Sequence, residues 1–89
     1  MTSASVTDIL PIAYVSLVLG EYSGKDVTYV SDTSTVSYYT AAADSDPATY
    51  VSSSGALTVN IGTNATSSAG GSIPAGTKEL VLYQVKINP

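Results

Sequence analysis

Short strand-forming runs, each ended by turn residues, constrain the fold of this chain more than any other feature. Val, Thr, Tyr and Ile are frequent, and these residues favour extended backbone. The runs are separated by Gly, Pro, Asp or clustered Ser, and apolar residues alternate with polar ones instead of recurring at helical spacing. The sequence therefore predicts an all-β protein with almost no helix.

Six strands are predicted from these runs. They cover residues 12–19, 27–30, 35–40, 50–52, 56–61 and 80–87. Short polar turns at 31–34 and 53–55 predict two hairpins, formed by the second and third strands and by the fourth and fifth. Because 89 residues without cysteine provide one small core and no disulfide, we expect a single domain over 1–89. Its predicted architecture is a small antiparallel β-sandwich or barrel.

Two segments fall outside the predicted strands. Residues 1–11 are predicted to form an N-terminal arm, and residues 62–77 a long polar loop. Loops of this length without an apolar run are usually functional or mobile, and we expect residues 62–71 to move or to contact a partner. Ile73 is its only large apolar residue, and it is predicted to pin the loop to the core.

A short motif occurs twice in the chain. Thr-Tyr-Val-Ser stands at 28–31 and again at 49–52, twenty-one residues later, and 13–16 is a partial copy. The repeat has two interpretations, a duplicated hairpin or a coincidence among residues that are common here. Both interpretations predict two similar hairpins.

The charge of the chain excludes several classes of partner. The net charge is −4, and the three basic residues, Lys25, Lys78 and Lys86, are scattered. Nucleic-acid binding needs clustered cations, and so does binding to an acidic membrane surface, so we expect neither partner. The apolar run at 9–19 is too short to span a bilayer as a helix. No basic segment precedes it as in a signal peptide, so it is predicted to be a buried strand.

The residue types leave little room for catalysis. Without His or Cys the chain cannot build a Ser-His-Asp triad or a thiolate nucleophile, so we expect no enzyme activity and no cofactor. The candidate metal site is a calcium site formed by Asp44 and Asp46, with Asp32 from a neighbouring turn. The alternative is that Asp44 and Asp46 cap N–H groups of a solvated turn before Pro47.

Seven tyrosines are the only aromatic residues. Tyrosine combines an apolar ring with a polar hydroxyl and therefore suits half-buried interfaces. Tyr38 and Tyr39 are neighbours on one predicted strand, so they should face opposite sides, and one of them should leave the core. We predict Tyr22, Tyr38 and Tyr39 as interface residues. The alternative is that tyrosine simply replaces phenylalanine in a small core.

The predicted strands have unprotected edges. They contain one charged residue, Lys86, and no proline, although monomeric β-proteins commonly protect their edges with Lys or Pro. Charged residues make up only 11% of the chain, against about 25% in an average soluble protein. We therefore expect a homo-oligomer or a subunit of a larger assembly. A closed barrel, which has no free edge, is the alternative.

The Ser-, Thr-, Ala- and Gly-rich strands suggest a family, together with Ser-Gly-Ala-Leu-Thr-Val-Asn-Ile at 54–61 and Ile-Pro-Ala-Gly-Thr at 73–77. In these features the chain resembles small virion structural proteins of tailed bacteriophages, especially capsid decoration (cement) proteins and head-fibre modules. The resemblance implies a non-enzymatic virion protein that binds the major capsid protein or other virion subunits. Two alternatives remain open, an extracellular or cell-surface β-module of pilus-like or adhesive type and a small carbohydrate-binding module.

Overall fold

The computed structural model describes residues 2–42 and 46–88, and within these ranges the chain forms strands and turns but no helix. The all-β prediction is confirmed. The strands are β1 (Ser5–Ile9), β2 (Val15–Leu17), β3 (Val27–Val30), β4 (Val36–Tyr39), β5 (Ala48–Val51), β6 (Ala56–Asn60), β7 (Leu80–Leu82) and β8 (Val85–Ile87). Over the described part of the chain there is accordingly no helix with the length and apolar character needed to cross a membrane.

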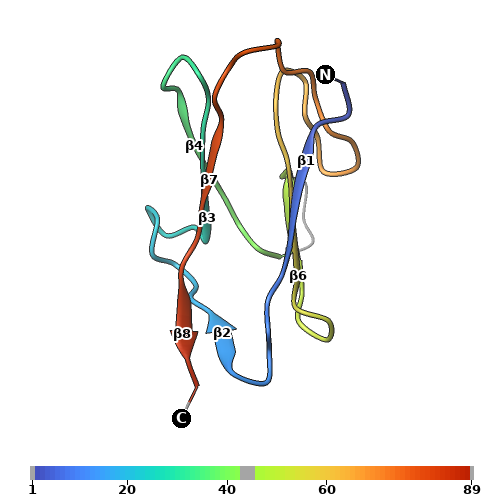
Figure 1. Ribbon diagram of the computed structural model, residues 1–89. Helices are drawn as coiled ribbons and strands as arrows, with labels where there is room; N and C mark the ends of the chain where they lie inside the picture. Colours follow the sequence, from blue (N-terminus) through green and yellow to red (C-terminus); the bar gives the residue numbers. More distant parts are fainter. Residues whose placement is uncertain (1, 43–45, 89) are drawn as a thin grey trace.

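The strands form three small antiparallel sheets that are arranged in two layers (Figure 1). One layer is the sheet β1-β6-β5, and the other is the sheet β4-β3-β7. The pair β2–β8 continues the second layer toward the lower end of the molecule in Figure 1. The protein measures 42 × 24 × 23 Å along its principal axes, so the space between the layers is long and narrow.

The core lies between the two layers. Its largest fully buried side chains are Leu57 and Val59 of β6 and Val27 of β3. Side chains along β6 alternate between buried and partly exposed, as the period of two in a strand requires. The central strand of each three-stranded sheet therefore supplies the main apolar contacts across the layers.

Both predicted hairpins are present, β3 with β4 and β5 with β6. In the first hairpin, Ser34 N donates to Ser31 O at 2.8 Å, and Ser31 N donates to Thr35 O at 3.0 Å. Ser34 adopts the left-handed conformation, with a φ of 65°. A tight turn followed by one left-handed residue is a common hairpin loop, which explains how a run of Ser and Thr reverses the chain here.

The repeated motif falls on β3 and β5, but the two hairpins are not paired equivalently. The loop between the paired strands has one residue fewer in the second hairpin (52–55) than in the first (31–35). A shift of one residue reverses which face of the following strand turns inward. Val36 is therefore 47% exposed, whereas Leu57, twenty-one residues later, is 2% exposed.

The strands differ from the prediction near both ends of the chain. The arm expected at 1–11 contains β1, which pairs with β6 along its whole length. The strand expected at 12–19 is shortened to β2, because Tyr14 N donates to Pro11 O at 2.9 Å in a turn. The strand expected at 80–87 is divided into β7 and β8, which pair with β3 and β2 respectively. Residues 2–42 and 46–88 thus form eight strands, where six were predicted for the chain.

The polar loop at 62–77 folds back on itself beside the first layer. Thr63 and Ser72 exchange both backbone hydrogen bonds, at 2.9 and 3.0 Å, and so extend the sheet by one bridge. Ile73 is partly buried and packs against the core, which confirms the predicted anchor. The base of the loop is therefore fixed by backbone hydrogen bonds on one side and by an apolar contact on the other.

Candidate interaction surface

The edge of β5 is closed by a segment of the same chain. In an antiparallel edge strand, alternate N–H groups point away from the neighbouring strand. Tyr50 N donates to Ala41 O at 2.8 Å, and Ala48 N donates to Asp46 Oδ1 at 3.1 Å. Because these donors are already used, the edge of β5 does not offer a free template to another strand.

Two carboxylates hold the segment that closes this edge. Asp46 Oδ2 accepts from Thr40 N at 2.6 Å and from Thr40 Oγ1 at 2.9 Å. Asp26 Oδ2 accepts from Ala41 N at 2.7 Å, and its Oδ1 accepts from Gly20 N at 2.8 Å. Sequence reasoning missed Asp26, because its partners lie 6 and 15 residues away and form no local motif.

The carboxylates considered for calcium have other roles or lie outside the described residues. Asp44 belongs to the residues that are not described. Asp46 accepts hydrogen bonds from Thr40 N and Ala48 N. Asp32 Oδ1 accepts from Lys78 N at 2.9 Å. In the ranges that the structure covers, no group of three or more His, Cys, Asp or Glu side chains is placed to hold a metal ion.

The tyrosines considered for an interface differ in exposure. Tyr38 and Tyr39 lie on opposite faces of β4, as predicted, and Tyr38 is 44% exposed. Tyr39 is half-buried and stacks on Tyr29, with ring centroids 6.5 Å apart and an interplanar angle of 17°. Tyr22 is also half-buried, in a tight turn where it exchanges both backbone hydrogen bonds with Lys25. Of the three, Tyr38 presents the most free surface to a partner.

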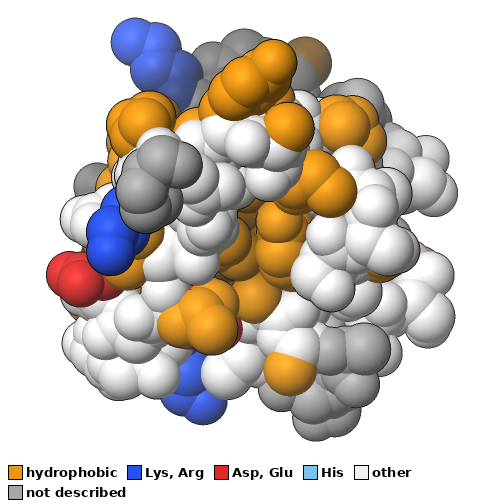
Figure 2. Space-filling model, turned by 90° about the horizontal axis from the view of Figure 1, so that it is seen from below, with side chains coloured by type: hydrophobic (Ala, Val, Ile, Leu, Met, Phe, Trp, Pro, Cys, Tyr) orange, Lys and Arg blue, Asp and Glu red, His pale blue; other side chains and the backbone are white. Residues whose placement is uncertain are grey.

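An apolar hollow opens at the lower end of the molecule, where hydrophobic side chains gather (Figure 2). Its volume is about 380 Å³. In β8, Val85 and Ile87 are the cross-strand partners of Leu17 and Val15, which line the hollow. We call this surface the lower patch, and its members are Ile12, Val15, Leu17, Leu19, Tyr50, Val85 and Ile87.

The lower patch is uncovered because the second layer is longer than the first at this end. Cross-strand partners share one face of a sheet, so Ile87 lies on the same face as Val15, which is turned toward the core. The β2–β8 pair extends below the hairpin of β5 and β6 (Figure 1). Val15 is 9% exposed, whereas its cross-strand partner Ile87 is 73% exposed.

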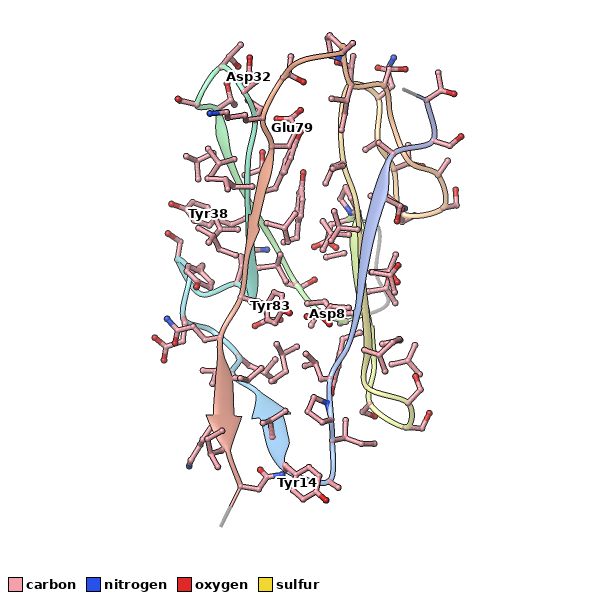
Figure 3. All side chains as sticks on the ribbon, in the orientation of Figure 1. Asp8, Tyr14, Asp32, Tyr38, Glu79 and Tyr83 are labelled. Carbon is pink, nitrogen blue, oxygen red and sulfur yellow. The ribbon has the colours of Figure 1, made fainter. Side chains whose placement is uncertain are left out.

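A second cavity, of about 330 Å³, lies at the opposite end, near Asp32 and Glu79 (Figure 3). Most of its lining residues are serines and threonines, namely Ser31, Thr33, Thr35, Ser37, Thr63, Ser72 and Thr77. Tyr29 OH donates to Glu79 Oε1 at 3.1 Å and accepts from Gly62 N at 3.2 Å. Glu79 Oε2 is buried and has no hydrogen-bond partner among the described residues. The Tyr29 phenol thus ties β3 to the polar loop and to the residue that precedes β7.

Replacing Tyr29 with phenylalanine should lower the free energy of unfolding at neutral pH by about 1–2 kcal/mol, because it leaves the partly buried Glu79 Oε1 and Gly62 N without this partner. Burial raises the pKa of Tyr29 above its usual 10.0, and the hydrogen bond to Glu79 raises it further. Above pH 10.0 the unfolded chain therefore loses the Tyr29 proton more readily than the folded protein, and stability falls as pH rises.

The prediction is checked by urea denaturation at neutral pH and at several values above pH 10. The stability difference between the wild type and Tyr29→Phe should shrink as the pH rises, because the variant lacks the phenol whose ionisation opposes folding. Tyr38→Phe is the matched control, and it should change stability at neutral pH by less than about 0.5 kcal/mol. If the stability difference between the wild type and Tyr29→Phe were as large above pH 10 as at neutral pH, the proposed role of the Tyr29 phenol would be contradicted.

No family model matches this chain, and no similar curated protein or solved structure was found.

The two most exposed tyrosines are separated on the surface. Stacking on a carbohydrate chain needs aromatic rings that lie side by side on one surface. Tyr14 is 71% exposed and Tyr38 is 44% exposed, but they lie at well-separated heights of the molecule (Figure 3). Sequence reasoning missed the exposure of Tyr14, because it placed this residue in a strand and not in the turn after Pro11.

Proposed function

We propose that the protein is a non-enzymatic structural subunit that binds in many copies to a larger assembly. The observation that carries this proposal is the exposure of the lower patch, where Ile87 is 73% and Leu19 is 65% exposed. Contiguous apolar surface of this kind typically marks an interaction site. Burial of either side chain against a partner would contribute on the order of 1–2 kcal/mol.

The sparse charge of the chain supports the same function. Only 11% of the residues are charged, so a partner that covers the lower patch has few ions to desolvate. Lys86 lies between Val85 and Ile87 in β8, and the alternation of a strand turns it to the opposite face. An apolar partner surface can therefore reach the lower patch without burying this ammonium group.

On the basis of the chain's composition, the proposed assembly is a bacteriophage capsid. Hydroxyl-rich, cysteine-free strands resemble those of decoration and cement proteins, and the proposed partner is the major capsid protein or another virion subunit. In this proposal the lower patch is the main contact, and Tyr38 and Tyr22 are candidates for further contacts. A pilus-like or adhesive module is the alternative, and the particle with which the protein copurifies distinguishes the two.

Ile87→Ser should weaken assembly at least about tenfold without unfolding the protein, because it removes the most exposed aliphatic side chain of the lower patch. Leu80→Ser is the matched control, since Leu80 is 56% exposed but lies outside the patch. Pelleting with the native particle measures binding, and urea denaturation checks the fold. Equal binding by the two variants would contradict the role of the lower patch.

A further inference from the structure

The outer edge of β1 has backbone groups through which copies of this chain could associate. β1 pairs with β6 on one side only and is the outer strand of its sheet. Ile61 N donates to Ala4 O, and Leu10 N donates to Gly55 O, so the even-numbered residues point their backbone groups toward β6. The odd-numbered residues of β1 therefore point their N–H and C=O groups outward, and these residues are Ser5, Thr7 and Ile9.

This edge is open and is held in an extended shape. No described residue accepts from the N–H groups of Ser5, Thr7 or Ile9. Both ends of the strand are fixed, because Ala4 N donates to Gly71 O at 3.0 Å and Leu10 N donates to Gly55 O at 2.8 Å. An ordered edge loses little conformational entropy on pairing, and an unprotected edge is a template for another strand.

The other outer strands of the two layers have fewer unpaired backbone groups at their edges. The N–H groups of β5 are used by Ala41 and Asp46, as described above. Just before β4, Ser31 N donates to Thr35 O, so the backbone groups of Thr35, Ser37 and Tyr39 point toward β3. Within β4, only Val36 and Tyr38 therefore point their backbone groups outward. β7 has only three residues, all of which pair with β3, and the alternation leaves the backbone groups of Val81 alone pointing outward. β1 is thus the longest open edge within the described strands of these layers.

We propose that β1 pairs with β1 of a second copy in antiparallel orientation, with Thr7 on the twofold axis. This inference rests on the proposed role as an assembly subunit and names one of its contacts. In this register Ser5 faces Ile9 of the second copy, and Thr7 faces its own counterpart. All three outward residues then exchange both N–H···O bonds, and the two β1-β6-β5 sheets become one continuous sheet.

The side chains of β1 permit this pairing. Ser5, Thr7 and Ile9 are uncharged, so no ion has to be desolvated on their face. Asp8 is the one charged residue of β1, and it lies on the opposite face, where it accepts a hydrogen bond from Tyr83 OH (Figure 3). In the proposed register Asp8 faces Val6 of the second copy, so the two carboxylates are not directly opposed.

A single-cysteine cross-link tests the register, and the chain has no native cysteine to interfere. Thr7→Cys should form a disulfide-linked dimer under mild oxidation, because hydrogen-bonded residue pairs in antiparallel strands have Cα atoms about 5.5 Å apart. Ile9→Cys is the control, since its two copies would lie about 14 Å apart at about 3.4 Å per residue. Cross-linking of Ile9→Cys as fast as Thr7→Cys, or none of Thr7→Cys, would overturn the proposal.

A proline variant separates this inference from the proposed function. Thr7→Pro removes an outward N–H group and keeps the β1–β6 bonds, so it should weaken self-association about tenfold or more. Val36→Pro makes the same change on the edge of β4 and should have no such effect. Thr7→Pro that self-associates like the wild type refutes the β1 pairing. If Thr7→Pro binds the native particle like the wild type while Ile87→Ser binds it more weakly, the assembly function stands without the β1 contact.

Discussion

Replacing Leu57 with alanine should lower the free energy of unfolding by about 3–4 kcal/mol. Leu57 is 2% exposed and is one of the largest fully buried side chains. The protein is narrow, so few other apolar groups can move into the cavity that the substitution leaves. Because small domains are stabilised by only about 5–15 kcal/mol, this loss should remove a large share of the protein's stability.

Urea denaturation followed by circular dichroism measures this loss. Leu80→Ala is the matched control, because it removes the same atoms from a side chain that is 56% exposed. The control should cost less than about 1 kcal/mol. Equal losses in the two variants would mean that the core does not lie between the two layers at β6.

Gly71→Ala should destabilise the protein by about 2–3 kcal/mol, the range of an overpacked site. A Cβ atom at this position would lie 2.3 Å from Thr63 O and 2.7 Å from the carbonyl carbon of Gly62. Both contacts are with backbone, so no side chain can turn aside. Gly71 also links the polar loop to the sheet, since its N–H donates to Ile61 O at 2.8 Å.

The matched control for this prediction is Gly24→Ala. Gly24 has a φ of 78°, but no heavy atom lies within 4 Å of a Cβ built on it. The control should therefore cost only the strain of a left-handed residue, about 1 kcal/mol. Thermal unfolding of both variants tests the difference. A Gly71→Ala protein as stable as the control would show that the base of the polar loop is loosely held.

Local chemistry explains why part of the fold could be predicted from the sequence. The strand at 27–30 coincides with β3, and both hairpins are formed, because a polar turn between two strand-forming runs acts over a few residues. The opposite orientations of Tyr38 and Tyr39 follow from the alternation of any strand. Ile73 was predictable as an anchor since no other large apolar residue lies in its loop.

Features that depend on distant partners could not be predicted in this way. β1 is a strand because β6, about fifty residues later, supplies its hydrogen bonds, and its own sequence has only weak alternation. The orientation of β4 depends on one additional loop residue, which turns Val36 outward. The lower patch arises from the unequal lengths of the two layers, a property that no single segment encodes.

Fractionation of particles from the native source tests the central claim, a subunit of a larger assembly, most directly. Density-gradient separation followed by mass spectrometry measures where the protein sediments and how many copies accompany each partner. The account predicts that the protein sediments with a large particle, at a fixed ratio to the major subunit of that particle. Recovery of the protein solely as a free monomer, separate from every particle, would contradict it.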